Sequence, residues 1–171
     1  MSTSAPHQQH QAQSPRHVRC AVITVSDTRT LDTDTGGQAV VDHLTAGGHT
    51  VVAREIVPDE PDRLRPLVLT LSDRDDVDAI LLTGGTGIAR RDQTYETIVA
   101  LCDKLLPGYG ELFRWLSYQE IGPAAILSRL IGGVIKDKIL LTMPGSPAAV
   151  RLAMEKIVVP ELGHLVREAR R

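Results

Sequence analysis

The sequence is poor in cysteine, in aromatic residues and in net charge, and each shortage argues against a class of protein. Its only two cysteines, Cys20 and Cys102, stand inside apolar segments, where reduced core residues are more common than a disulfide framework. The formal net charge of -2 gives no sign of the basic face that nucleic-acid-binding proteins carry. We therefore expect neither a disulfide-stapled domain nor a DNA- or RNA-binding protein.

Long hydrophobic runs are also missing. The longest apolar runs span about five residues, far below the roughly 20 that cross a bilayer. Residues 1–17 contain no apolar stretch of the kind that a secretory signal peptide requires. We therefore expect a cytoplasmic protein with no membrane partner. We also expect residues 1–16 to form a disordered tail, because they lack hydrophobic periodicity.

The remainder, residues 17–171, is predicted to form a single domain. Hydrophobic residues make up 42% of the sequence and charged residues 23%, both close to globular averages. Strand patterns at 18–25, 50–57 and 78–83 are each followed by a helical pattern. This order predicts an α/β fold of three layers, in which helices cover both faces of a mostly parallel, doubly wound sheet.

Turn residues mark the ends of the predicted helices. Thr35 and Gln38 form a T-x-x-Q capping pattern before a helix of about three turns. Ser146 is the expected N-cap of the last helix, with Pro147 at its first position and a kink or restart at Pro160. The other predicted elements are a helix after the glycine turn and a polar stretch, carrying Ile98, Val99, Cys102 and Leu105, then two helices between Gly108 and a stop at Gly132-Gly133, and strands at 134–135 and 138–143.

A ligand site is expected beyond the carboxyl ends of the strands, where the connecting loops of an open α/β sheet converge. The segment Thr83-Gly84-Gly85-Thr86-Gly87 supplies backbone N–H groups that can approach a phosphate closely. It matches neither the Walker pattern nor G-x-G-x-x-G, so a plain tight turn stays an alternative. Gly145-Ser146-Pro147 begins a second phosphate-compatible turn, for which an ordinary helix cap is the simpler explanation.

Two carboxylates stand in these loops. Asp59 follows a strand and Asp92 follows the glycine turn, so both could face one ligand and hold a hydrated Mg²⁺ between phosphate oxygens. Helix capping explains Asp59 equally well when it is taken alone. Arg90 and Arg91 either neutralise phosphate or form a solvated pair. The sequence shows no convincing nucleophile with a partnered base, which suits transfer between bound phosphates.

Several segments, taken in order, carry a resemblance to a known family. They are Thr24–Thr28, Asp34–Gly36, Val57–Glu60, Thr83–Gly87, Arg91-Asp92, Pro107–Arg114, Leu116-Ser117, Glu120–Gly122, Leu127–Arg129 and Met143–Pro147. In this order they resemble the MoaB/MogA family of molybdenum cofactor biosynthesis proteins, over the whole chain outside the tail. Glu120–Gly122 and Gly145–Pro147 look closest to the MoaB branch.

The resemblance implies a molybdopterin-binding domain, trimeric or built from trimers up to a hexamer, that uses MgATP to adenylylate the phosphate of molybdopterin and releases pyrophosphate. By position it implies catalytic roles for Asp59 and Asp92, which would also hold Mg²⁺. Substrate and nucleotide contacts are implied for Ser26, Gly84, Gly85, Thr86, Gly87, Ser128, Gly145 and Ser146. The resemblance also suggests a downstream molybdenum-insertion protein as a partner that receives the product.

Tyr95 departs from the family pattern, which commonly has proline after Arg-Asp-x-Thr, and a phenol beside the loop would alter the pocket. Members of the MoaB branch are not uniformly catalytic, so the alternative is a noncatalytic molybdopterin-binding or carrier protein. The presence of both aspartates favours the enzyme. A third hypothesis is an assembly scaffold in which Phe113, Trp115 and Tyr118 form an oligomer face, although core packing accounts for them equally well.

Overall fold

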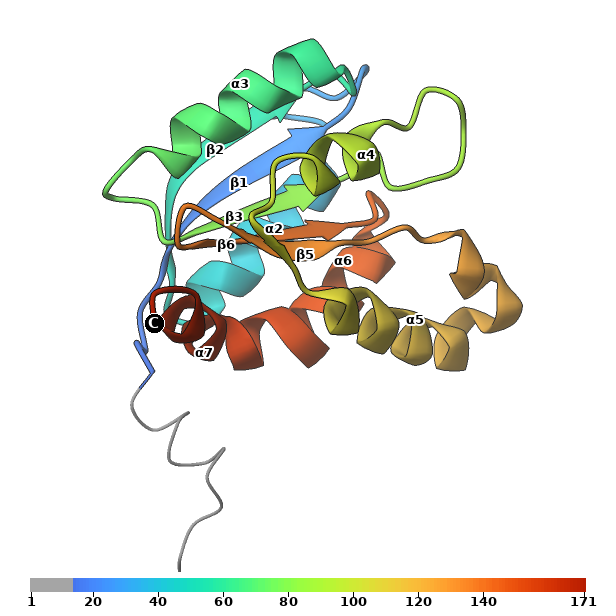
Figure 1. The fold of residues 1–171 in the computed structure, drawn as a ribbon. Coiled ribbons are helices and arrows are strands. Elements are labelled where there is room, and N and C mark those ends of the chain that lie inside the picture. The colour runs from blue at the N-terminus through green and yellow to red at the C-terminus, as the bar shows by residue number, and fades with distance from the viewer. Residues whose placement is uncertain (1–13) are drawn as a thin grey trace, which may run out of the picture.

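A six-stranded sheet with the order β2-β1-β3-β6-β5-β4 forms the middle of the molecule (Figure 1). The computed structural model describes residues 14–171. From β1 the chain goes first to the neighbour on one side, β2, and then to the neighbour on the other side, β3, as a doubly wound sheet requires. The strands are β1 (Arg19–Val25), β2 (Thr50–Val57), β3 (Ala79–Thr83), β4 (Lys104–Leu105), β5 (Gly132–Ile135) and β6 (Lys138–Met143).

The sheet is mostly parallel, as predicted, with an antiparallel edge. β1 pairs parallel with β2 and β3, and β3 pairs parallel with β6. β5 runs antiparallel to both β6 and β4. The β5–β6 hairpin turns through Lys136 and Asp137, whose φ angles of 47° and 61° give the two left-handed residues of a tight hairpin. The α/β prediction is confirmed, and the antiparallel part is confined to one side.

Helices cover both faces of the sheet (Figure 1). α3 and α4 lie on one face, and α2, α5, α6 and α7 lie on the other. This arrangement gives the three predicted layers. The helices are α2 (Thr35–Ala46), α3 (Pro61–Ser72), α4 (Thr94–Val99), α5 (Pro107–Ile121), α6 (Pro147–Ala153) and α7 (Val159–Ala169), with a 3₁₀ helix at Gly122–Leu127 and a π-helical turn at Met154–Val158.

Alternate residues of the central strands point into two separate cores. Val22 and Leu81 pack on the face covered by α2, α5, α6 and α7. Ile23 and Leu82 pack on the face covered by α3 and α4, and all four side chains are fully buried. Because both faces of these strands are covered, the sequence shows nearly continuous apolar runs there instead of alternation.

Local boundaries differ from the sequence predictions at three places. The cap of α2 is Asp34 and not Thr35, because the Asp34 carboxylate accepts a hydrogen bond of 2.8 Å from the Gly37 N–H. α4 ends at Val99, so the helix predicted to reach Leu105 is wrong, and Leu105 belongs to β4. Gly132 and Gly133 do not stop a helix but begin β5, where a Cβ at Gly133 would lie 2.5 Å from the Cys102 sulfur.

The C-terminal helical segment bends where Pro160 predicts a change. A π-helical turn, Met154–Val158, separates α6 from α7, and Pro160 occupies the first turn of α7. Of the predicted tail, residues 1–13 lie outside the described part of the chain. Ser14 and Pro15 lie against α7, since a Cβ at Gly163 would lie 2.2 Å from the Pro15 carbonyl oxygen and 3.7 Å from the Ser14 Cβ.

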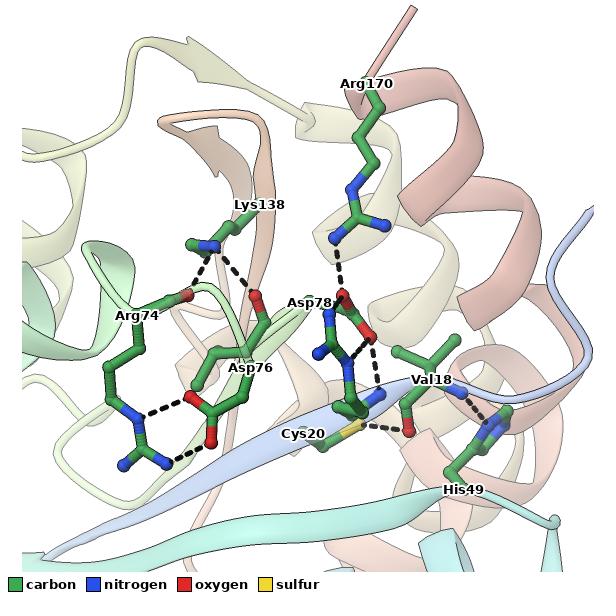
Figure 2. A network of polar contacts seen from close by, with 10 residues as sticks. Val18, Cys20, His49, Arg74, Asp76, Asp78, Lys138 and Arg170 are labelled. Carbon is green, nitrogen blue, oxygen red and sulfur yellow. Dashed lines mark hydrogen bonds and ion pairs between the residues drawn. The ribbon is translucent and has the colours of Figure 1, made fainter.

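A buried carboxylate fastens α7 to the base of the sheet (Figure 2). Asp78 accepts hydrogen bonds from the backbone N–H and the guanidinium of Arg19, at 2.7 to 3.0 Å, and from the guanidinium of Arg170. Burial raises the pKa of Asp78, but the hydrogen bonds from Arg19 and Arg170 outweigh it and hold that pKa well below its usual range. This network lies at the amino end of β3, opposite the loops that follow the strands.

Candidate functional site

The loops after β1, β3 and β6 meet at the carboxyl edge of the sheet, as the topology predicts. A Cβ at Gly84 would lie 2.2 Å from the carbonyl oxygen of Val25, the last residue of β1. A Cβ at Gly145 would lie 3.4 Å from the Gly84 Cα atom, and the Gly84 N–H donates to the Met143 carbonyl at 3.0 Å. The glycine turn and the turn before α6 are therefore in direct contact.

The backbone of the glycine turn has a conformation that larger residues rarely adopt. Gly84 and Gly85 have φ angles of 99° and 65°, and a Cβ at Gly85 would lie 2.0 Å from Thr94 Oγ1. Backbone and polar side-chain atoms therefore lie where side chains at Gly84 and Gly85 would have to stand.

Asp59 lies beneath this turn, between β2 and α4. Its carboxylate is 6% exposed and accepts a hydrogen bond from Thr94 Oγ1 at 3.0 Å and one from the Gln93 N–H at 3.2 Å. Burial raises the pKa of Asp59, the two hydrogen bonds lower it in part, and the nearby charge of Asp92 raises it again. Asp59 therefore secures the start of α4 and also borders the glycine turn, since a Cβ at Gly85 would lie 2.6 Å from its Oδ2.

Asp92 approaches the same turn from the following loop. Its Oδ2 accepts a hydrogen bond of 2.9 Å from the Ala89 N–H, and a Cβ at Gly87 would lie 2.4 Å from that oxygen. The side chain is half-buried. The structure thus brings Asp59 and Asp92 to one rim of the sheet, on a single glycine-rich turn.

Arg91 is paired with carboxylates in this structure, although its side chain stays 47% exposed. Its Nε donates to Asp27 Oδ2 at 2.9 Å and its second terminal nitrogen donates to Asp27 Oδ1 at 2.7 Å. The first terminal nitrogen donates to the Asp59 carbonyl at 2.9 Å. The Arg91 hydrogen bond lowers the pKa of Asp27. Sequence reasoning did not single out Asp27, although a polar residue directly after β1 was the available signal.

Cavities near the site fall into two groups. The first is a space of about 110 Å³ against Ser26, Gly84 and Gly145, which adjoins a larger cavity of about 470 Å³ through the shared residues Ser26 and Arg29. The second is a separate cavity of about 420 Å³ lined by Tyr95, Ser128 and Arg129, among others.

The predicted binding residues divide between these spaces. Ser26, Gly84 and Gly145 line the first group, and Ser128 lines the second. Ser146 caps α6, because its hydroxyl accepts a hydrogen bond from the Ala149 N–H at 3.3 Å. Thr86 is buried, and its carbonyl accepts a hydrogen bond of 3.0 Å from the Arg129 N–H.

Arg129 is the site residue that reasoning from residue patterns missed. Its Nε donates to the Gly87 carbonyl at 2.6 Å, and one terminal nitrogen donates to the Asp92 carbonyl at 3.0 Å. The other terminal nitrogen pairs with the Glu96 carboxylate. The guanidinium carbon lies 5.3 Å from the centre of the Tyr95 ring. Only the resemblance in Leu127–Arg129 pointed to this position, because a single arginine after a 3₁₀ helix has no distinguishing spacing.

Nucleophilic groups are poorly suited to covalent chemistry here. Burial raises the pKa of the Cys20 thiol to about 12 and that of the Cys102 thiol to about 11, and neither cysteine forms a disulfide.

Within residues 14–171 no group of three or more His, Cys, Asp and Glu side chains is placed to hold a metal ion. A cation at Asp59 and Asp92 would need further oxygen ligands from a bound substrate.

None of the helices in the described part of the chain is both long enough and apolar enough to cross a bilayer.

Known proteins resemble this chain over most of its length. Residues 21–164 match the model of a family described as "Probable molybdopterin binding domain". The chain is 52% identical over 162 residues to molybdenum cofactor biosynthesis protein B of Halalkalibacterium halodurans, covering 94% of this chain and 95% of that protein. It is 52% identical over 165 residues to the protein of the same name from Bacillus subtilis, with coverage of 96% and 97%.

Solved structures give the same result. A crystal structure of molybdenum cofactor biosynthesis protein B superimposes with a TM-score of 0.89 at 50% identity, over 93% of this chain and 99% of that chain. The tungsten cofactor synthesizing protein MoaB from Pyrococcus furiosus superimposes with a TM-score of 0.80 at 35% identity, over 92% of this chain and 100% of its own. The chain therefore belongs to the MoaB family of molybdenum cofactor biosynthesis proteins.

Proposed function

We propose that this protein is a molybdopterin adenylyltransferase, which transfers AMP from MgATP to the terminal phosphate of molybdopterin. An oxygen of that phosphate attacks the α-phosphorus of ATP and forms a new P–O bond. The bond from the α-phosphorus to the bridging oxygen breaks, and pyrophosphate leaves with the electron pair. Such a reaction between two bound phosphates depends on positioning and charge neutralisation, and it needs no protein nucleophile.

The observation that carries this proposal is the placement of Asp59 and Asp92 against one glycine turn. A Cβ at Gly85 would meet the first carboxylate and a Cβ at Gly87 would meet the second. Two substrates that react with each other need adjoining binding spaces, and the space of about 110 Å³ against Gly84 adjoins the cavity of about 470 Å³.

The residues at the turn suit Mg²⁺ in their chemistry. Mg²⁺ is usually bound by one or two carboxylates together with substrate phosphates, and Asp59 and Asp92 supply that number. Each Asp59 oxygen accepts one hydrogen bond and keeps a lone pair, and within residues 14–171 Asp92 Oδ1 accepts none. When bound with ATP, the ion would neutralise the charge that gathers as the two phosphates approach.

A noncatalytic molybdopterin-binding or carrier protein is the second candidate, and one observation favours it. Both oxygens of Asp59 already serve the backbone and side chain at the start of α4, which is the structural role of a cap. In that case the pocket would hold the pterin without orienting a metal. The same carboxylate thus supports either function, and only turnover separates them.

The test is incubation of the purified protein with molybdopterin and MgATP. The enzyme hypothesis expects adenylylated molybdopterin and pyrophosphate to appear in equal amounts. The carrier hypothesis expects molybdopterin to bind, in isothermal titration calorimetry, while neither product forms. Release of phosphate instead of pyrophosphate would contradict the proposed reaction.

We also propose a homo-oligomer, a trimer or a hexamer, that works in the cytoplasm and passes its product to a molybdenum-insertion protein. Of the three aromatic residues predicted to form an oligomer face, Phe113 is unsuitable, since it is buried in the core. Trp115 and Tyr118 are 61% and 59% exposed. Four other exposed apolar residues belong to the same helix or to the 3₁₀ helix after it: Leu112, Ile121, Ile126 and Leu127. An apolar surface of this kind on one element favours contact with another subunit.

A further inference from the structure

Arg129 binds the glycine-rich loop at both ends of one short segment. Its Nε donates to the carbonyl of Gly87, and a terminal nitrogen donates to the carbonyl of Asp92. These two carbonyls belong to the first and last residues of the segment 87–92. The Arg129 backbone N–H donates to the Thr86 carbonyl as well, which places a third contact one residue earlier. Arg129, which lies between the 3₁₀ helix and β5, thus spans the loop that carries Asp92.

A planar guanidinium is well suited to this task. It presents five N–H donors in a fixed fork, so two carbonyls that it binds are held at a set separation. An ammonium group is a compact point charge on a flexible stem and cannot impose that geometry. The loop needs such a restraint because its turn contains Gly84, Gly85 and Gly87, and glycine loses more conformational freedom on ordering than other residues.

The guanidinium is itself held by two side chains of α4. The Tyr95 ring lies beneath it, with 5.3 Å between the guanidinium carbon and the ring centre, and the Glu96 carboxylate pairs with its remaining terminal nitrogen. A cation over an aromatic face within about 6 Å is attracted by the ring. Tyr95 stands where the resembling family commonly has proline, so this chain places an aromatic face at a position where that pattern has none.

We propose that Arg129 is a positioning residue that fixes the loop 84–92, and with it the carboxylate of Asp92, and that Tyr95 stiffens this arrangement by stacking on the guanidinium. Arg129 acts through the loop backbone, since its fork is occupied by the carbonyls of Gly87 and Asp92 and by Glu96. The consequence for loop order stands on these contacts alone. The consequence for turnover rests on the proposed adenylyl transfer.

Loop order is tested first, by hydrogen–deuterium exchange of peptides that cover residues 84–94 in the full chain without ligands. Arg129→Ala should speed exchange there by about tenfold or more, while the protein stays folded by circular dichroism. Arg129→Lys should recover only a small part, because the fork is lost. Arg114→Ala is the matched control: this arginine lines the same cavity but donates to the Ser128 carbonyl, so loop exchange should stay at the wild-type rate.

Tyr95 is tested in the same measurement. Tyr95→Phe keeps the ring and should exchange like the wild type, whereas Tyr95→Leu should speed exchange of the loop by roughly threefold. An unchanged rate in Arg129→Ala overturns the proposal for the loop. An unchanged rate in Tyr95→Leu overturns the part assigned to Tyr95.

Kinetics then test the consequence for the reaction. Arg129→Ala should lower kcat by about thirtyfold and raise the Mg²⁺ concentration for half-maximal rate, while KM for molybdopterin changes by less than about threefold. Added guanidinium ion at low millimolar concentration should restore part of kcat, which a residue needed only for folding would not allow. A fall in kcat matched by an equal rise in KM for molybdopterin, with no rescue by guanidinium ion, would contradict a positioning role. An inactive wild type would instead refute adenylyl transfer, and the exchange experiment would still decide the loop proposal.

Discussion

Arg91 and Asp27 face each other across the rim of the site with two parallel hydrogen bonds, of 2.9 and 2.7 Å. Asp27 follows β1, whereas Arg91 belongs to the loop before α4, so the pair joins two loops that are far apart in sequence. Arg91 also donates to the Asp59 carbonyl at 2.9 Å. A fork-to-fork pair of this kind fixes geometry in a way that a single contact does not.

Breaking this pair should lower turnover without unfolding the protein. Arg91→Ala and Asp27→Ala should each reduce kcat/KM by roughly tenfold, because each leaves the rim less ordered. The double variant should lose little more than either single one, since both changes remove the same contact. The rate of pyrophosphate release gives kcat/KM for all three variants. If the two losses multiply in the double variant, the pair does not act as a unit.

Replacing Asp92 or Asp59 with alanine should remove catalysis while leaving the pterin bound. The expected loss of transition-state stabilisation is ~3 kcal/mol or more, roughly a hundredfold in rate, with a far smaller change in molybdopterin affinity. Asp59→Ala should also lower the free energy of unfolding by about 1–3 kcal/mol, because a buried carboxylate loses the hydrogen bonds from Thr94 and Gln93.

Pyrophosphate release and calorimetry with molybdopterin separate the two effects. Asp62→Ala, an exposed carboxylate in the first turn of α3, is the control and should change neither quantity. Full turnover in both alanine variants would show that the roles of Asp59 and Asp92 are purely structural.

Asp78 should stabilise the fold most above its unfolded pKa. Its folded pKa is depressed, so its contribution is complete above about pH 4, where the unfolded side chain is ionised, and is lost as pH falls from there toward the folded pKa. At pH 7, Asp78→Asn should lower the free energy of unfolding by about 1–3 kcal/mol; Arg19 and Arg170 are partly exposed, which keeps the value below that of a fully buried pair.

Urea denaturation at pH 7 and pH 3 measures this difference. The difference in the free energy of unfolding between the wild type and Asp78→Asn should be smaller at pH 3 than at pH 7. Asp76→Asn removes an exposed carboxylate paired with Arg74 in the same region (Figure 2) and should leave the urea midpoint close to that of the wild type. An equal difference in the free energy of unfolding at both pH values would contradict a stabilising role for the Asp78 charge.

His49 should make the protein less stable in weak acid. Burial, and then the neighbouring His17, lower the pKa of His49, and its Nδ1 accepts a hydrogen bond of 3.2 Å from the Val18 N–H. The unfolded chain takes up a proton below about pH 6.5 that the folded protein resists, so the free energy of unfolding should fall between pH 7 and pH 5. His49→Gln removes the titrating ring and should flatten this dependence. An unchanged slope would assign the effect to other groups.

The exposed face of α5 should govern assembly. We expect the wild type to sediment well above the 18.6 kDa of one chain, and Trp115→Glu with Tyr118→Glu to shift the protein toward that mass. Thr70→Glu, on the exposed side of α3, is the control and should leave the assembly intact. A wild type that is monomeric at high micromolar concentration would rule out this interface.

The sequence predicted the sheet well because its strands carry their own signal. Val22, Ile23, Leu81 and Leu82 lie in nearly continuous apolar runs, which only a strand covered on both faces requires. The convergence of the loops followed from topology alone, and so did the common rim of Asp59 and Asp92. Short elements were harder: α4 spans six residues, and apolar residues beyond it continued the helical spacing although they belong to a turn and to β4.

The contacts that organise the site could not be predicted from spacing. Arg129 reaches the Gly87 carbonyl across 42 positions and Arg91 reaches Asp27 across 64, and a single sequence contains no pattern at such separations. The cap of α2 was misplaced by one residue for a related reason. Asp34 accepts hydrogen bonds from both Gly37 and Thr24, and the second of these comes from β1.

The two edges of the sheet differ in what they would offer to a strand from another molecule. β4 is only two residues long, so it presents too few unpaired backbone groups to template aggregation. β2 at the other edge is eight residues long and is followed by Pro58. Within β2, Glu55 is exposed and Arg54 stands beside it, and charge on an edge strand discourages pairing. Protection against edge-to-edge aggregation of the folded protein therefore depends on β2, where neutral substitutions at Glu55 would weaken it most directly.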